Sequence, residues 1–164
     1  MAEHWYQLVE SDDGFLKSAP FRYENSVEVP APPERTWELL TTDDTLVSWT
    51  RLVTSLRWLS PRPFGVGTVR ELTLLGLLTG RERYFRWEEG KRNSYSVVAL
   101  SFPGIRRWAE DYIVEPTHSG SRLTWTLAIE PVPLLKPILL ASKPITSVVT
   151  RHVLQSIRSH VGCY

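Results

Sequence analysis

The chain has 164 residues, and its 19 Lys and Arg nearly balance its 18 Asp and Glu to give a net charge of +1. This balance excludes a global field that would recruit nucleic acid or an anionic membrane surface. The length suits one domain with a substantial core. We divide it into an irregular N-terminal arm over residues 1–20 and a single domain over residues 21–161.

The cysteine content and the apolar segments bear on the compartment. Cys163 is the single cysteine, so no intramolecular disulfide or thiolate metal cluster can form, which fits a reducing compartment. The N-terminus has neither a basic start nor an apolar run, so no signal peptide is visible. The most apolar stretches, 72–78 and 132–145, are too short to span a bilayer. These features predict a cytoplasmic protein without an integral membrane segment.

The first elements in chain order are a strand and a helix. Residues 21–29 alternate between apolar and polar side chains, which predicts a strand with one face in water. Pro32 and Pro33 fit the start of a helix, and Trp37 and Leu40 give that helix an apolar stripe. A second short helix is expected near residues 46–49.

Six further strand-like segments follow, at 54–59, 68–75, 81–87, 94–102, 105–115 and 122–130. Regularly spaced turns between them favour an antiparallel meander. Pro131 and Pro133 forbid further strand, and a short helix is expected up to Ser142. Pro144 then marks a new start or a kink before a closing helix that ends near Val161. This order predicts an α+β fold in which one long helix covers a face of a curved, mostly antiparallel sheet, with a ligand cavity between them.

Three segments carry a resemblance to a known family. They are Val-Glu-Val-Pro-Ala-Pro-Pro-Glu-Arg-Thr-Trp at 27–37, Gly-Val-Gly-Thr-Val-Arg at 65–70 and Gly-Ser-Arg-Leu-Thr-Trp-Thr at 120–126. In this order and spacing the chain resembles the START-like SRPBCC superfamily, which includes the birch-pollen allergen and polyketide cyclase/dehydrase-like proteins. The resemblance implies a helix-grip fold, with a seven-stranded sheet gripping the last helix around a hydrophobic pocket. It implies no single activity, because the family spans binders, carriers, cyclases and interaction modules.

Glu110 is the sharpest polar candidate for chemistry. Alternation within 106–115 places Trp108, Glu110 and Tyr112 on one face of the strand, and the charged Arg107, Asp111 and Glu115 on the other. A carboxylate between two aromatic side chains would be desolvated, as a general acid or base requires. Alternatively, Glu110 forms a buried ion pair, or the sheet edge bends and exposes its side chain to solvent.

The closing helix offers a second group of candidates. His152, Ser156 and His160 recur at every fourth residue beside the apolar stripe that contains Val149 and Val153. A histidine there could donate to a ligand carbonyl or shuttle a proton; alternatively, both histidines lie at a solvent-exposed helix edge. A metal pair is not expected, because the two histidines lie about 12 Å apart along a helix.

Aromatic side chains supply most of the other expected walls of the cavity, although ordinary core packing is the alternative for each. The expected ligand contacts are Trp37, Tyr84, Tyr95, Trp108, Glu110, Tyr112, Trp125, Val149, His152, Val153 and Ser156. Arg70 and Glu71 are adjacent, so only one of them can face the cavity, and the pattern does not decide which.

These patterns favour the binding of a small hydrophobic or polycyclic molecule, with no cofactor, no metal and no nucleic-acid partner, by a monomer or homodimer. One alternative is a cyclase- or dehydratase-type enzyme whose groups, drawn from Glu110, His152 and Tyr112, converge on one void. Another is a protein-interaction module that uses Trp5, Tyr6 and the exposed surface of the meander.

Overall fold

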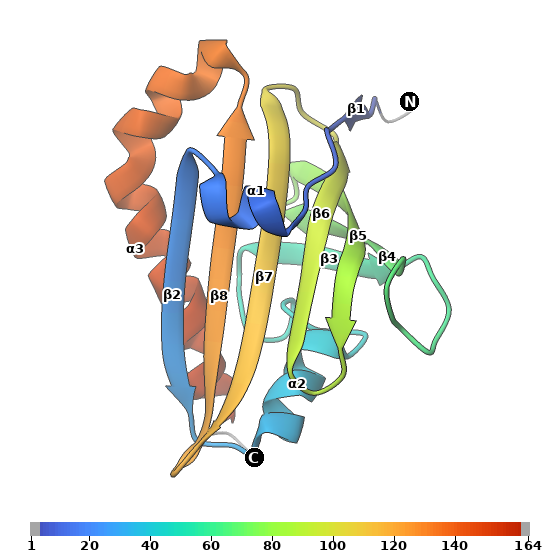
Figure 1. Ribbon diagram of the computed structural model, residues 1–164, viewed down its shortest axis with the longest axis vertical. Coiled ribbons are helices and arrows are strands. Elements are labelled where there is room, and N and C mark those ends of the chain that lie inside the picture. The colour runs from blue at the N-terminus through green and yellow to red at the C-terminus, as the bar shows by residue number, and fades with distance from the viewer. Residues whose placement is uncertain (1–3, 162–164) are drawn as a thin grey trace.

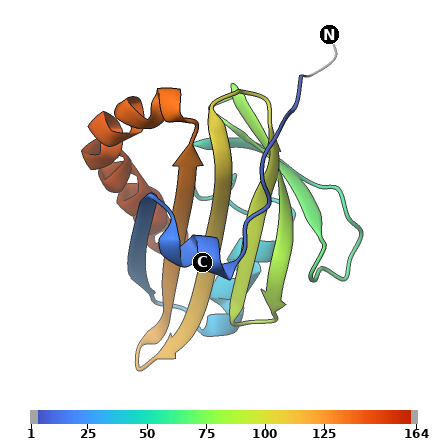
Figure 2. The ribbon, with the colours of Figure 1, turned by 45° about the horizontal axis from the view of Figure 1, so that its top comes forward.

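The computed structural model describes residues 4–161, so Cys163 and the first three residues of the predicted arm lie outside the described part of the chain. A curled antiparallel sheet forms the body, and a long helix runs along one side of it (Figures 1 and 2). The main path of the sheet has the order β2-β8-β7-β6-β5-β4-β3. The predicted α+β helix-grip fold with seven mostly antiparallel strands is therefore confirmed.

The strands of this path lie close to their predicted positions, because each alternates between an inner and an outer face. They are β2 (Phe21–Val29), β3 (Val53–Trp58), β4 (Val69–Leu74), β5 (Leu78–Glu88), β6 (Arg92–Leu100), β7 (Ile105–Thr117) and β8 (Gly120–Pro131). Strand β2 pairs with β8, so the first and last strands of the path in sequence are neighbours. The curl brings the inner faces of β4 to β8 around one volume.

The helices depart from the prediction in two places. α2 (Pro33–Thr41) begins at the prolines as expected, but residues 43–49 form turns instead of a second short helix. Leu46 has a φ of 64°, a left-handed conformation that a right-handed helix cannot contain.

The second departure concerns the closing helix. The one-turn helix η1 (Pro133–Leu135) is followed by a single helix, α3 (Lys136–Val161), with Pro144 inside it. The expectation of a new helix start at Pro144 is therefore wrong, whereas the other expectation, a kink, stays a prediction. Pro144 removes one backbone hydrogen bond, and it lies on an exposed part of the helix, where the freed carbonyl can bind water.

The N-terminal arm is more ordered than predicted. β1 (Tyr6–Gln7) pairs with β6, and α1 (Asp13–Ser18) crosses the outer face of the sheet (Figure 1). The Asp12 side chain caps α1 by accepting a hydrogen bond of 2.9 Å from the Phe15 amide. Phe15 and Leu16 then bury their side chains against Ala109 and Ala128. The prediction of an irregular arm is therefore wrong over residues 13–18, which form a capped helix.

α3 is buried over only part of its length. Its C-terminal half buries Thr150, Val153, Leu154 and Ile157, and the helix lies along β2. Its N-terminal half leaves Ile138, Ile145 and Val148 more than half exposed. Within residues 4–161, no helix is both long and apolar enough to cross a membrane.

Candidate functional site

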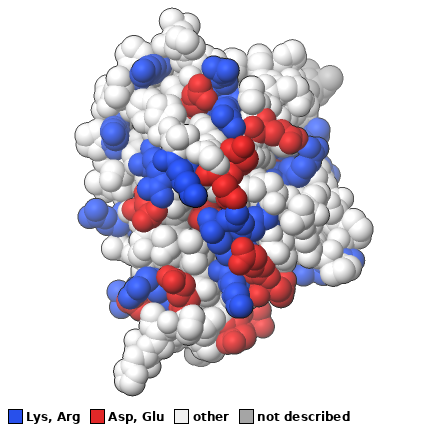
Figure 3. Space-filling model, viewed as in Figure 1, with Lys and Arg blue, Asp and Glu red and all other residues white. Residues whose placement is uncertain are grey.

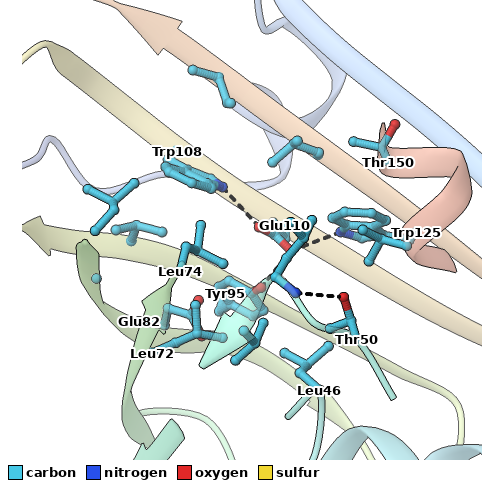
Figure 4. Close-up of a pocket in the computed structure, with 18 of the residues that line it drawn as sticks. Leu46, Thr50, Leu72, Leu74, Glu82, Tyr95, Trp108, Glu110, Trp125 and Thr150 are labelled. Carbon is cyan, nitrogen blue, oxygen red and sulfur yellow. Dashed lines mark hydrogen bonds between the residues drawn. The ribbon is translucent and has the colours of Figure 1, made fainter. Parts of the chain in front are cut away.

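A cavity of about 280 Å³ lies between the inner face of the sheet, α3 and residues 46–53 (Figure 4). Its walls are mainly apolar because the inward positions of five strands carry aliphatic and aromatic side chains. The aliphatic lining consists of Leu46, Leu52, Val53, Leu72, Leu74, Leu78, Val97, Leu100, Leu127, Ile129, Val149 and Val153. The volume lies near the lower end of the range of about 300–1,000 Å³ that is typical of ligand pockets.

Glu110 lies in this wall with its carboxylate surrounded by four donors. Trp108 Nε1 donates to Oε1 at 3.0 Å, and Trp125 Nε1 donates to Oε2 at 2.8 Å (Figure 4). The Tyr95 and Tyr112 hydroxyls donate to Oε2 at 2.6 Å and 3.2 Å. Three of the four donors therefore converge on Oε2 and one reaches Oε1, so both oxygens of the carboxylate are hydrogen-bonded. We call Glu110 and these four aromatic residues the Glu110 cluster.

The register of the sheet assembles this cluster. Trp108, Glu110 and Tyr112 alternate along one face of β7, as the sequence predicted. Tyr95 on β6 is the direct neighbour of Glu110, and Trp125 on β8 is the direct neighbour of Tyr112. Directly opposed residues of neighbouring strands share a face, so all five side chains meet on the inner face of the sheet.

The surroundings of the two tyrosines in the cluster favour the protonated form of their hydroxyls. Burial, followed by the negative charge of Glu110, raises the pKa of Tyr95 well above its ordinary value. The same two causes raise the pKa of Tyr112. Both hydroxyls therefore stay protonated at neutral pH and can donate to the Glu110 carboxylate.

A buried ion pair lies on the neighbouring strands. Arg70 on β4 is the direct neighbour of Glu82 on β5, and its Nε donates to Glu82 Oε2 at 2.5 Å. The two residues are only 2% and 4% exposed. The Arg70 guanidinium also lies 4.9 Å from the Tyr95 ring centroid and 5.4 Å from that of Tyr84. Arg70 is thus the inward member of the Arg70–Glu71 pair that the sequence left undecided.

The environment of Glu82 favours its protonated form despite this partner. Burial raises the pKa of Glu82 to about 7 even though Arg70 lowers it, and the negative charge of Glu110 contributes to the increase. Glu82 lines the cavity, whereas Arg70 lies behind it beside Tyr84. Among the described residues, the cavity is therefore lined by two carboxyl groups and by no Lys, Arg or His side chain.

The structure brings most of the predicted contact residues to this cavity and separates the rest. The cavity is lined by Tyr95, Trp108, Glu110, Tyr112, Trp125, Val149 and Val153. Tyr84 lies behind the ion pair. Trp37 is core, where its Nε1 donates to Glu89 at 2.9 Å and its ring packs edge-on against Trp87.

His152 and Ser156 lie in a separate groove. The groove has a volume of about 940 Å³ and runs between α3 and residues 48–52. It also contains His160 and Arg51. His152 is exposed and does not line the cavity, so the structure brings Glu110 and Tyr112 together but does not bring His152 to them. Among residues 4–161, no group of three or more His, Cys, Asp and Glu is arranged to hold a metal ion.

Glu82 is the functional candidate that the sequence reasoning missed. Tyr84 was expected to face inward, and alternation puts Glu82, two residues earlier, on the same face of β5. The signal that located Glu110 was therefore present in β5 as well.

Comparisons with known proteins agree with this architecture. A family model described as "Polyketide cyclase / dehydrase and lipid transport" matches residues 20–162. An uncharacterized protein of Mycobacterium tuberculosis is 31% identical over 146 residues, which cover 89% of this chain and 87% of that protein.

Two solved structures share the fold at low sequence identity. A START superfamily protein from Mycobacterium smegmatis aligns with a TM-score of 0.70 and 14% identity, covering 86% of this chain and 97% of that one. The protein Ara h 8.0201 aligns with a TM-score of 0.64 and 14% identity, covering 88% and 99%.

Proposed function

The chain belongs to the family described as polyketide cyclase / dehydrase and lipid transport, and we propose that its cavity binds the apolar body of a small molecule. One observation carries the proposal: a cavity of about 280 Å³ is walled mainly by aliphatic and aromatic side chains. Such walls favour an apolar ligand because its transfer from water is worth about 25 cal/mol per Å² of buried apolar surface.

The charges around the cavity restrict which part of a ligand can enter. Glu82 and Glu110 line it, and Arg70 lies behind Glu82. An anionic group inside would therefore face two carboxylates in a poorly solvated volume. Both oxygens of the Glu110 carboxylate already accept hydrogen bonds from the protein, so the cluster can form part of the cavity wall without a polar partner from the ligand.

Binding of an uncharged fluorescent probe tests this proposal. N-phenyl-1-naphthylamine should show saturable, enhanced emission with the protein, and decanol should displace it. Val97→Phe places a larger side chain inside the cavity and should weaken dye binding by about tenfold. Val66→Phe is the matched control, because Val66 is 71% exposed and lies outside the cavity.

Thermal melts must show that both variants fold. Dye binding that Val97→Phe leaves unchanged, or that Val66→Phe weakens equally, would contradict a ligand in this cavity. Absence of saturable binding to the wild type would contradict the proposal as a whole.

Acid–base catalysis is a second candidate function, and Glu82 favours it. Its carboxyl lines the cavity, and its pKa of about 7 suits proton transfer at neutral pH. In that case the wild type should accelerate exchange of the α-protons of 2-decanone in deuterated water, followed by NMR. Glu82→Gln should abolish the acceleration, whereas equal exchange with both proteins would contradict this candidate.

A further inference from the structure

We propose that the groove between α3 and residues 48–52 recognises an anionic head group, a carboxylate or a phosphate monoester, on a ligand whose apolar body occupies the cavity. This inference rests on the proposed function, because it assigns the polar end of the same ligand. It adds a second, chemically distinct compartment to the site.

The groove and the cavity are adjacent. Thr50, Leu52, Val149 and Val153 line both of them. The first two residues belong to the segment before β3, and the other two belong to α3. An amphiphile that passes between these segments has its apolar end among the strands and its polar end in the groove.

Arg51 supplies a positive charge that the protein itself does not use. Every other arginine between residues 22 and 122 has a carboxylate partner within 4.0 Å. Arg51 is exposed in the groove and forms no ion pair or side-chain hydrogen bond with any residue in the described range 4–161. Its guanidinium can therefore donate two parallel hydrogen bonds to a carboxylate or phosphate.

The rest of the groove agrees with an anionic partner. Its other polar side chains include His152 and Gln155, which can donate hydrogen bonds, and no Asp or Glu lines it. The segment from residue 131 to the end of the sequence has no Asp or Glu at all, but it has two lysines and two arginines. The part of α3 that precedes the groove also lacks negative charge: the upper left of Figure 3, where the N-terminal half of α3 runs, shows white and blue atoms without red.

The two compartments act in the same direction on a ligand. The carboxylates of Glu82 and Glu110 disfavour a negative group inside the cavity, and Arg51 favours it in the groove. Opposite preferences at the two ends fix one orientation, with the apolar end inward. The whole-chain charge balance conceals this local asymmetry.

A matched series of ten-carbon amphiphiles tests the proposal. Decanoate, decyl phosphate, decanol and decyltrimethylammonium compete with N-phenyl-1-naphthylamine, all below their critical micelle concentrations. The two anions should bind the wild type about five- to tenfold more tightly than decanol at low ionic strength, and the cation more weakly than decanol. Salt at about 0.5 M should reduce the advantage of the anions.

Variants locate the effect. Arg51→Gln should remove the advantage of the anions and leave decanol affinity unchanged. Arg158→Gln is the control, because Arg158 is an exposed arginine of α3 outside the groove, and it should change neither affinity. An equal loss in both variants would overturn the proposal in favour of a diffuse surface field, and so would equal wild-type affinities for decanoate and decanol.

The same series shows whether a carboxylate or a phosphate is the preferred head group. It also distinguishes failure of the proposed function from failure of the inference about the groove. Decanoate preferred over decyl phosphate identifies a carboxylate head group, and the reverse preference identifies a phosphate. Inorganic phosphate alone should not displace the dye, and displacement by it would overturn the link between groove and cavity. If decanol also fails to bind, the proposed function fails; if decanol binds without any advantage for the anions, only the inference about the groove fails.

Discussion

Glu82 and Glu110 bring the same chemical group to the wall of one cavity, and the molecule accommodates the two carboxylates differently. Glu82 lies opposite a single buried cation, Arg70. Glu110 forms no ion pair within the described residues and instead accepts hydrogen bonds from four neutral aromatic donors. The first arrangement depends on one partner, whereas the second is distributed over four. Loss of a single partner should therefore cost far more at Glu82 than at Glu110.

Removal of Arg70 should give the largest effect. Arg70→Met leaves Glu82 buried without its cation and should lower the free energy of unfolding by about 3–5 kcal/mol, measured by urea denaturation. Adding Glu82→Gln to that variant should restore part of the loss, because a neutral amide needs no cationic partner. Arg122→Gln is the control on the outer face, where the pair with Glu28 is half exposed, and should cost less than about 1 kcal/mol. A loss no larger than that of the control would contradict the role given to Arg70.

The second-largest effect should be a pH dependence of the free energy of unfolding that is caused by Glu82. Its pKa is about 7 in the folded protein and 4.5 as an ordinary carboxyl group, so the folded state binds more protons between those values. The free energy of unfolding should therefore fall as pH rises from about 4.5 to 7, by about 3 kcal/mol relative to Glu82→Gln. Urea denaturation of both proteins at pH 4.5, 6 and 8 measures the difference. Parallel profiles would show that Glu82 is not perturbed.

Glu110→Gln should have a smaller effect of about 1–3 kcal/mol. An amide oxygen can accept the hydrogen bonds that Oε2 receives from Tyr95, Tyr112 and Trp125. The amide NH₂ then faces the Trp108 N–H, so that donor loses its acceptor. Thermal and urea unfolding measure the loss. An increase in stability would mean that the carboxylate is an uncompensated charge and that the four donors do not balance it.

Tyr112→Phe should have the smallest effect. The Tyr112 hydroxyl makes the longest hydrogen bond of the cluster, at 3.2 Å, and Glu110 Oε2 retains two other donors without it. We expect a loss of about 1 kcal/mol or less in the free energy of unfolding. A loss as large as that of Arg70→Met would show that the cluster is no more distributed than the ion pair.

The sequence predicted the fold because alternation and turn chemistry are local signals. Strands such as β2 alternate cleanly, and the prolines at the start of α2 mark a helix start. The missed elements depend on context that the sequence does not display. Leu46 adopts a left-handed conformation among cavity residues, and α1 is stabilised by burial of Phe15 and Leu16 on a sheet formed much later in the chain.

The part of the candidate site that lies on a single strand could be predicted from the sequence. Alternation in β7 placed Glu110 with Trp108 and Tyr112, but the contacts with Tyr95 and Trp125 required the register between strands. The pair of Arg70 and Glu82 required that register too, because its members lie on different strands. His152 was placed beside the cavity because helical spacing gives an angle around α3 but not the distance of each face from the sheet.

We propose above that the cavity beside the Glu110 cluster holds the ligand. An NMR titration of the tryptophan indole N–H signals with decanol tests this most directly. Trp108 and Trp125 line the cavity and donate to Glu110, whereas Trp37 donates to Glu89 outside it. Each signal can be assigned by a single Trp→Phe variant. A ligand in this cavity should give saturable shifts of the Trp108 and Trp125 signals and leave the Trp37 signal unchanged. Unchanged Trp108 and Trp125 signals at saturating decanol, or a shift confined to Trp37, would contradict this proposal.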